Sequence, residues 1–129
     1  MTREEFIDIL ERKGYSYELE GDKIVVTGKG VVDLWTLKTL PPDVVFKNGW
    51  DVHLRALKTL PPGVVFKNGG YVHLESLETI PPGVVLKNGG DIDLESLVGE
   101  WFGDWKGNIK GIKSKRLLNW MISKGLFER

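Results

Sequence analysis

The sequence predicts a mainly β protein, a small β-solenoid of about four coils that each take 20 residues. Nearly the same 20-residue sequence occurs three times, beginning at Leu37, Leu57 and Leu77. Apolar residues within each copy alternate at a spacing of two, which is the period of a strand. Each copy also contains two successive prolines, which the interior of a helix does not tolerate.

Residues 1–21 are expected to form an N-terminal helical cap. Thr2 and Glu5 have the spacing of a capping box, which satisfies free amides in the first turn of a helix. The apolar face of this helix consists of Phe6, Ile7 and Leu10. Gly14 is expected to end it. Because an open stack of coils exposes unpaired strands, a cap protects its end from association.

Residues 22–97 are expected to form the solenoid itself. Stacking at the ~4.8 Å strand spacing places each apolar residue above its own kind in the next coil. The columns start at Val32, Leu34, Leu37, Leu40, Val44 and Phe46. A half-coil at 22–29 aligns Ile24, Val25 and Val26 with Val44, Val45 and Phe46. The three asparagines Asn48, Asn68 and Asn88 are expected to form a hydrogen-bonded ladder at one corner.

Residues 98–129 are expected to form a C-terminal aromatic and helical cap, with a helix at about 115–124. Ser114 is a suitable N-cap residue, and Gly125 is a suitable residue to end the helix. The apolar face of this helix consists of Leu117, Leu118, Met121 and Ile122. The two caps and the solenoid are expected to form one folding unit.

The repeat unit resembles short repeat proteins, mostly of unknown function, from bacterial and phage genomes. From Leu57 to Leu77 it has the form L-x-x-L-P-x-G-V-x-F-x-N-G-G-x-V-x-L-x-x-L. The resemblance implies a β-solenoid fold and a phage origin, and it transfers no catalytic residues. Bacterial leucine-rich repeats are similar only in part. Their asparagine follows the last leucine by three positions, whereas Asn68 follows Phe66 by two, which favours a solenoid over a horseshoe.

Composition argues against several classes of function. The chain has no cysteine, which excludes disulfides, thiolate zinc sites and thiol catalysis. Lys and Arg balance Asp and Glu at 18 each, so no strong field directs the whole chain to nucleic acid or to a membrane. No apolar run reaches the ~18 residues of a membrane span. The start of the chain lacks the apolar segment of a signal peptide, and a cytoplasmic location is therefore expected.

Enzymatic activity is not expected. A stack of about four coils offers no deep, water-excluding cleft of the kind that catalysis requires. Glu75 and Glu95 share a column with Trp35 and Arg55. We interpret this column as mixed surface charge rather than as a pair of catalytic carboxylates. No cofactor is expected.

The two histidines are the candidates for a metal site. His53 and His73 share an outward-facing column with Asp33 and Asp93. Two imidazoles and a carboxylate can bind Zn²⁺ or Ni²⁺. We nevertheless expect a solvated face without a metal, because side chains on a flat ladder point in parallel and do not converge on one point.

A protein partner is the leading expectation. The rigid side of a solenoid presents flat columns of side chains, which suit a protein surface better than a small molecule. Exposed Trp and Arg side chains are typical anchors of interfaces. The candidate partner-binding residues are Trp35, Trp50, Trp105, Lys106, Lys110, Lys113, Arg116 and Trp120. The resulting hypothesis is a non-enzymatic protein-binding module, either monomeric or homodimeric.

The resemblance narrows this hypothesis to a phage-encoded inhibitor of a host defence factor, in the manner of an anti-CRISPR protein. Two alternatives stay open. The segment 98–129 carries seven basic and three acidic residues among its tryptophans. That composition suits a nucleic-acid-binding accessory protein. The other alternative is a purely structural repeat protein that serves in assembly.

Overall fold

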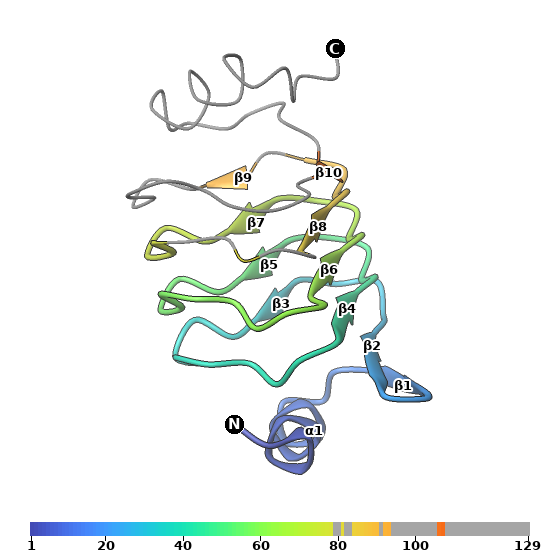
Figure 1. The fold of residues 1–129 in the computed structure, drawn as a ribbon. Helices are drawn as coiled ribbons and strands as arrows, with labels where there is room; N and C mark the ends of the chain where they lie inside the picture. The colour runs from blue at the N-terminus through green and yellow to red at the C-terminus, as the bar shows by residue number, and fades with distance from the viewer. Residues whose placement is uncertain (79–80, 82–83, 91, 94–105, 108–129) are drawn as a thin grey trace, which may run out of the picture.

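The protein winds into a β-solenoid that is preceded by one helix (Figure 1). The computed structural model describes residues 1–78, 81, 84–90, 92–93 and 106–107. Strand β2 pairs with β4, β4 with β6 and β6 with β8, so the described residues contain about three turns of the solenoid. The predicted fold class, mainly β with a solenoid and an N-terminal helix, is confirmed.

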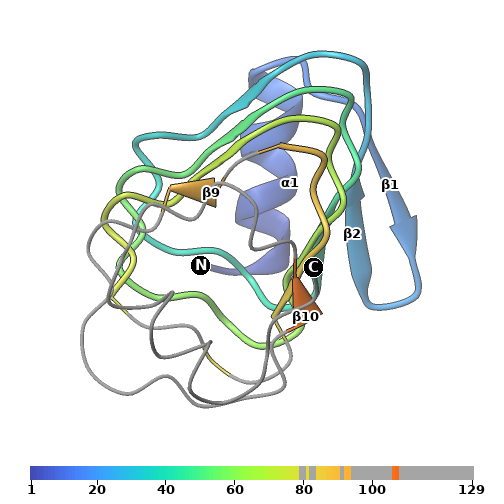
Figure 2. The same cartoon turned by 90° about the horizontal axis from the view of Figure 1, so that it is seen from above.

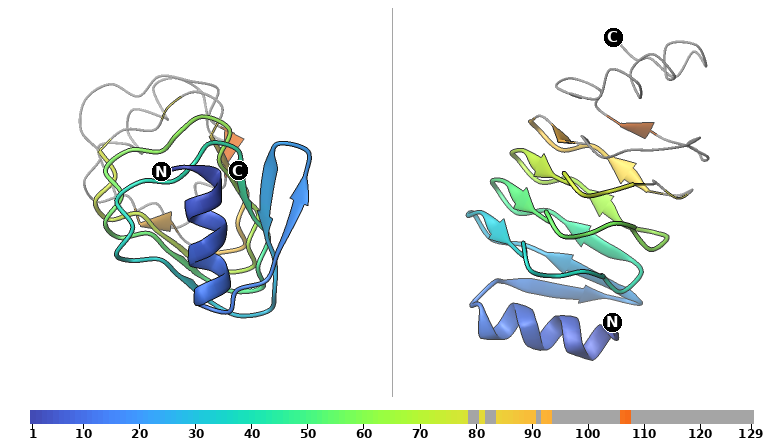
Figure 3. Two further views of the ribbon diagram at one scale, coloured as in Figure 1. Left: turned by 90° about the horizontal axis from the view of Figure 1, so that it is seen from below. Right: turned by 90° about the vertical axis from the view of Figure 1, so that its left-hand side faces the viewer.

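Two sheets form two sides of the solenoid (Figures 1 and 3). Sheet A contains, in spatial order, β1 (Tyr17–Glu20), β2 (Lys23–Val26), β4 (Val44–Phe46), β6 (Val65–Phe66), β8 (Val85–Leu86) and β10 (Lys106–Gly107). Sheet B contains β3 (Val32–Asp33), β5 (Val52–His53), β7 (Val72–His73) and β9 (Ile92–Asp93). All neighbouring strands are parallel except β1, which is antiparallel to β2.

Residues that pair between successive coils are 20 positions apart in the chain, as the sequence predicts. Val52 pairs with Val72 and His53 with His73 in sheet B. The predicted half-coil is also confirmed, because Ile24 pairs with Val44 and Val26 with Phe46. Strands β3 to β9 are only two or three residues long, and each is hydrogen-bonded to its own copy in a neighbouring coil.

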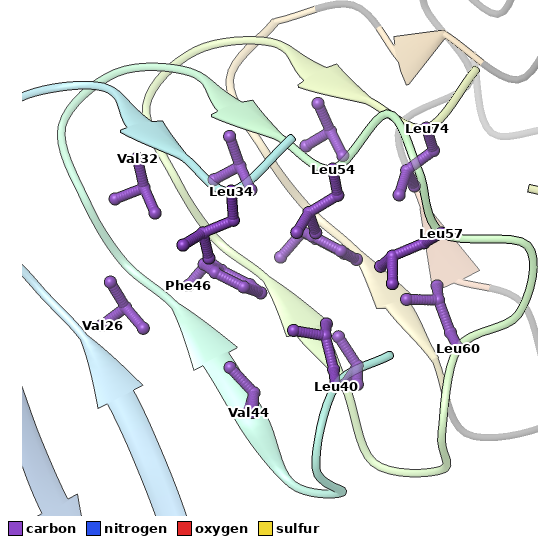
Figure 4. Packing of buried hydrophobic residues seen from close by; sticks show 14 of the residues in the cluster. Val26, Val32, Leu34, Leu40, Val44, Phe46, Leu54, Leu57, Leu60 and Leu74 are labelled. Atoms are coloured by element: carbon purple, nitrogen blue, oxygen red, sulfur yellow. The ribbon is translucent and has the colours of Figure 1, made fainter. Parts of the chain in front are cut away.

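The core lies between the two sheets and consists of columns of identical side chains. Leu34, Leu54 and Leu74 are each 0% exposed and follow one another along the inside of the solenoid (Figure 4). The rings of Phe46 and Phe66 stack with centroids 5.2 Å apart and planes at 6°. A side chain in such a column packs on a copy of itself, so a change of size in one coil leaves a cavity or an overlap in the next.

The asparagine corner joins successive coils through the main chain. Asn68 is 1% exposed, and its Nδ2 donates to the carbonyl oxygens of Trp50, Gly70 and Tyr71 at 3.0, 3.3 and 3.1 Å. Asn48 and Asn88 are equally buried and make corresponding bonds. The predicted column of asparagines is hydrogen-bonded, but these bonds run from each side-chain amide to backbone carbonyl oxygens of its own turn and of the coil before, rather than between asparagines.

The residue after each asparagine is a glycine because the coils approach closely there. A Cβ atom at Gly89 would lie 2.6 Å from the carbonyl oxygen of Gly69, which is too short for a real contact. At this approach, the backbone amide of Gly89 donates a hydrogen bond of 2.9 Å to the backbone carbonyl oxygen of Asn68. The repeated N-G pair is thus required by backbone packing.

The N-terminal helix α1 (Arg3–Arg12) lies across the open end of the first coil (Figures 2 and 3). Thr2 caps it by accepting a bond of 3.1 Å from the amide of Glu5. Phe6 and Leu10 are fully buried and belong to the same core as the solenoid leucines. Gly14, with φ of 73°, ends the helix as predicted.

The sequence analysis did not predict strand β1 within residues 1–21. Gly21, with φ of 61°, lies in the turn that joins β1 to β2. The predicted C-terminal cap at 98–129, with its helix at about 115–124, lies outside the described residues except for β10. Ile80 and Leu94, the continuations of two core columns, also lie outside them.

Replacing Asn68 with Ala should lower the free energy of unfolding by about 1–3 kcal/mol, because three carbonyl oxygens lose a buried donor. Urea denaturation followed by circular dichroism measures this change. Lys67→Ala, at an exposed neighbouring position, is the matched control and should unfold like the parent chain. Equal stability of the Asn68 variant would contradict the structural role of the corner.

Replacing Phe6 with Ala should lower the free energy of unfolding by about 3–5 kcal/mol, since a buried ring is removed from the end of the core. The same denaturation experiment measures the loss. The exposed Glu4→Ala change on the same helix should cost less than about 0.5 kcal/mol. If Phe6→Ala is as mild as Glu4→Ala, the helix does not cap the core.

Candidate functional site

The outer side of sheet B collects polar and aromatic side chains in a regular array. Val32, Val52 and Val72 point into the core, so the residues that flank them in each strand point outward. We call this outward array the sheet B face, and its members are Val31, Asp33, Trp35, Asp51, His53, Arg55, Tyr71, His73, Glu75 and Asp93.

The copies of the repeat differ from one another at this face. Successive coils carry Val31, Asp51 and Tyr71 in one column, Asp33, His53 and His73 in the next, and Trp35, Arg55 and Glu75 in the third. The outer positions of sheet A are the same in the three copies, with Val45, Val65 and Val85 followed by Lys47, Lys67 and Lys87. Val45 is 6% exposed, so packing restrains that column, but stacking does not require the exposed positions of sheet B to differ between coils. The sheet B face therefore has a composition that the fold does not explain.

Two imidazoles and a carboxylate converge at the centre of this face. Oδ2 of Asp51 lies 3.8 Å from Nε2 of His53 and 3.8 Å from Nε2 of His73. The two rings have centroids 4.4 Å apart and are tilted by 48°. The three side chains are partly buried, with exposed fractions of 29% for Asp51, 22% for His53 and 15% for His73.

Hydrogen bonds hold the outer atoms of this cluster. Nδ1 of His73 lies 2.9 Å from Oδ2 of Asp93 and 3.0 Å from Oε1 of Glu75. Oδ1 of Asp51 accepts a bond of 2.8 Å from the backbone amide of Tyr71. The positions of His73 and Asp51 are thus set by their neighbours in the same and the following coil.

Negative charge predominates in the described part of the sheet B face. Asp33, Asp51, Glu75 and Asp93 are acidic, and Arg55 is the one residue there with a permanent positive charge. Nε of Arg55 lies 3.5 Å from Oε2 of Glu75. Because both residues are partly exposed, this ion pair contributes little to stability. The remaining carboxylates leave the face suited to a cation or to a basic surface.

Large aromatic side chains are exposed in the same coils as the cluster and in the coil before them. Trp35 is 57% exposed, Trp50 is 62% exposed and Tyr71 is 48% exposed. A partly open hollow of about 330 Å³ is lined by Trp35 and Arg55 together with Asp33 and His53. Large exposed aromatic groups next to an Arg are typical of residues that anchor protein interfaces.

The structure brings together some of the predicted site residues. His53 and His73 lie in contact, as their shared column implies, but the expectation that they do not converge with a carboxylate is wrong. The carboxylate that meets their Nε2 atoms is Asp51, which sequence reasoning did not assign to the metal candidates. The D-x-H spacing from Asp51 to His53 could have indicated it, because both side chains point to one face of a strand.

The predicted partner-binding residues divide into three groups. Trp35 and Trp50 are exposed, and Trp35 lines a hollow with His53. The backbone of Lys106 lies in β10, next to β8. The remaining candidates lie outside the described residues and stay predictions: Trp105, Lys110, Lys113, Arg116 and Trp120.

No family model, curated protein or solved structure matches this chain. In the part of the chain that the structure describes, no helix is long and apolar enough to cross a membrane. The functional interpretation therefore rests on the geometry of the sheet B face.

Proposed function

We propose that this chain is a non-enzymatic protein-binding module and that its partner docks on the sheet B face. The observation that carries the proposal is the exposed Trp35, which lines a partly open hollow together with Arg55, while the ring of the exposed Tyr71 lies 6.2 Å from that of His73 on the same face. Large aromatic and Arg side chains contribute most of the free energy of binding in known interfaces. The two-residue strands of sheet B fix the backbone next to these residues, which limits the backbone entropy lost on binding.

The shape of the face favours a protein partner over a small molecule. Sites for small molecules are concave and enclose most of their ligand. The hollow beside Trp35 is partly open to solvent, and four residues line it in the described part of the chain. A flat array of side chains on successive coils matches the extended binding surfaces of other repeat proteins.

The charge of the face defines the chemistry of the partner. Asp33, Asp51, Glu75 and Asp93 outweigh Arg55 among its described residues. Complementary charges across an interface steer association and suppress wrong partners. The proposed partner is therefore a folded protein with Lys or Arg side chains around an apolar patch that receives Trp35.

The narrower proposal is that this partner is a host defence factor and that binding inhibits it. This narrower role is supported by the resemblance to phage repeat proteins. The acidic face does not favour nucleic acid as a ligand, because phosphates carry the same sign of charge. The alternative of a nucleic-acid-binding protein depends on residues 98–129, most of which lie outside the described part.

The immobilised protein should retain a specific protein from bacterial host lysate. Trp35→Ala and Trp50→Ala should each raise the dissociation constant of that complex about 10–100-fold. This change corresponds to a loss of ~1.4–2.7 kcal/mol of binding free energy, as expected for anchor residues. Titration of the purified partner by calorimetry measures the change. Lys67→Ala, on the outer side of sheet A, is the matched control and should bind like the parent chain.

The outcomes separate the candidate functions. Retention of no protein at high concentration, or equal binding by both Trp variants, would contradict docking on the sheet B face. Retention of further copies of this chain alone would support the structural alternative. Loss of the activity of the captured factor on binding would support the inhibitory role, and an unchanged activity would refute it.

A further inference from the structure

We infer that Asp51, His53 and His73 form a binding site for one divalent transition-metal ion of the Zn²⁺ class. This inference does not depend on the proposed protein partner. It differs from the expectation based on sequence because the three ligand atoms meet in space. Their mutual distances all lie within 4.8 Å.

The spacing of these atoms is that of metal ligands. Oδ2 of Asp51 is 3.8 Å from each Nε2 atom, which is too long for a hydrogen bond. Ligands bound to Zn²⁺ at ~2.0–2.1 Å in tetrahedral geometry lie about 3.3–3.4 Å apart. A movement of about half an ångström in each side chain would complete the coordination. The fourth position would face the solvent, where a water molecule or a partner's side chain can enter.

The hydrogen bonds around the cluster orient the ligand atoms correctly. In metal sites, the second nitrogen of a ligating histidine usually donates to a carboxylate, which fixes the tautomer. Nδ1 of His73 has such a partner, the carboxylate of Asp93 at 2.9 Å. With its proton on Nδ1, His73 presents an unprotonated Nε2 toward Asp51. The amide of Tyr71 holds Oδ1 of Asp51, which leaves Oδ2 directed at both imidazoles.

The charges of Asp51 and the two imidazoles favour a bound cation. An unprotonated Nε2 and a carboxylate oxygen repel each other at 3.8 Å unless a positive charge lies between them. Either a proton on an imidazole or a bound metal ion supplies that charge. Asp51, Glu75 and Asp93 surround His73, and Arg55 pairs with Glu75. An ion bound between the two imidazoles would neutralise the carboxylate of Asp51, which lies 3.8 Å from both Nε2 atoms.

A second group of potential ligands, His73 with Glu75 and Asp93, is less suitable. Its atoms lie 2.9 and 3.0 Å from Nδ1 of His73, which are hydrogen-bond distances. A proton therefore already occupies the space between them. The ligand set at Asp51 also contains two imidazoles, which favour Zn²⁺, Ni²⁺ or Cu²⁺ over Mg²⁺ and Ca²⁺.

Calorimetric titration of the chelator-treated protein with ZnCl₂ at neutral pH tests the site. We expect one Zn²⁺ per chain, a dissociation constant of about 10 μM or below, and no heat of binding with Mg²⁺ or Ca²⁺. Replacement by Co²⁺ should give the intense visible absorption of a four-coordinate ion. Zn²⁺ should also raise the melting temperature, because it binds the folded chain.

Variants decide whether these residues are the ligands. His53→Ala, His73→Ala and Asp51→Asn should each weaken Zn²⁺ binding by about tenfold or more. Asp33→Asn, in the same column but outside the ligand set, should bind within about twofold of the parent chain. Circular dichroism shows whether each variant is folded, and the single change Asp51→Asn keeps the size of the side chain.

Two results would overturn the inference. One is the absence of Zn²⁺ binding to the folded parent chain up to about 100 μM, in which case protons alone balance the charge. The other is binding that Asp51→Asn and both histidine variants leave unchanged. These measurements use the chain alone, so they do not depend on whether a protein partner is found.

Discussion

The parallel pairing of each coil with its own copy 20 residues away is the constraint on which the rest of the structure depends. Because the pairing is in register, each inward side chain of a repeat packs on the same or a similar apolar residue of the next coil, as Phe66 does on Leu86. Leu54 lies between Leu34 and Leu74, and Phe46 stacks on Phe66. A change in one copy would leave the columns mismatched, so the inner positions of the repeats stay nearly identical.

The same constraint explains why the candidate site lies where it does. Exposed outward positions are free of the packing requirement, and on sheet B they differ from copy to copy. Strand spacing then brings unlike residues of one column close together, as it does for Arg55 and Glu75. The site is a surface array held by a regular backbone, and its side chains are ordered by hydrogen bonds to the neighbouring coils.

The two proposals concern adjoining parts of one face. His53 belongs to the cluster with Asp51 and also lines the hollow beside Trp35. An ion at the cluster would lower the negative charge of the face and would fix the imidazole that borders the hollow. Metal binding and partner binding would then be coupled, since a ligand that orders the face reduces the entropy lost on docking.

The 20-residue period was sufficient to predict the length of each coil, the pairing between coils and the core residues of the repeats. For each residue of a repeat, the period identifies the residue that lies next to it in the following coil. The pairing of Ile24 with Val44 followed directly from that period. Only the tertiary structure revealed strand β1 (Tyr17–Glu20), whose sequence YELE lacks a repeat copy and whose pairing depends on the turn at Gly21. Likewise, only the structure brought Asp51 to the histidines. That contact crosses between columns and depends on side-chain torsions, which a repeat period does not specify.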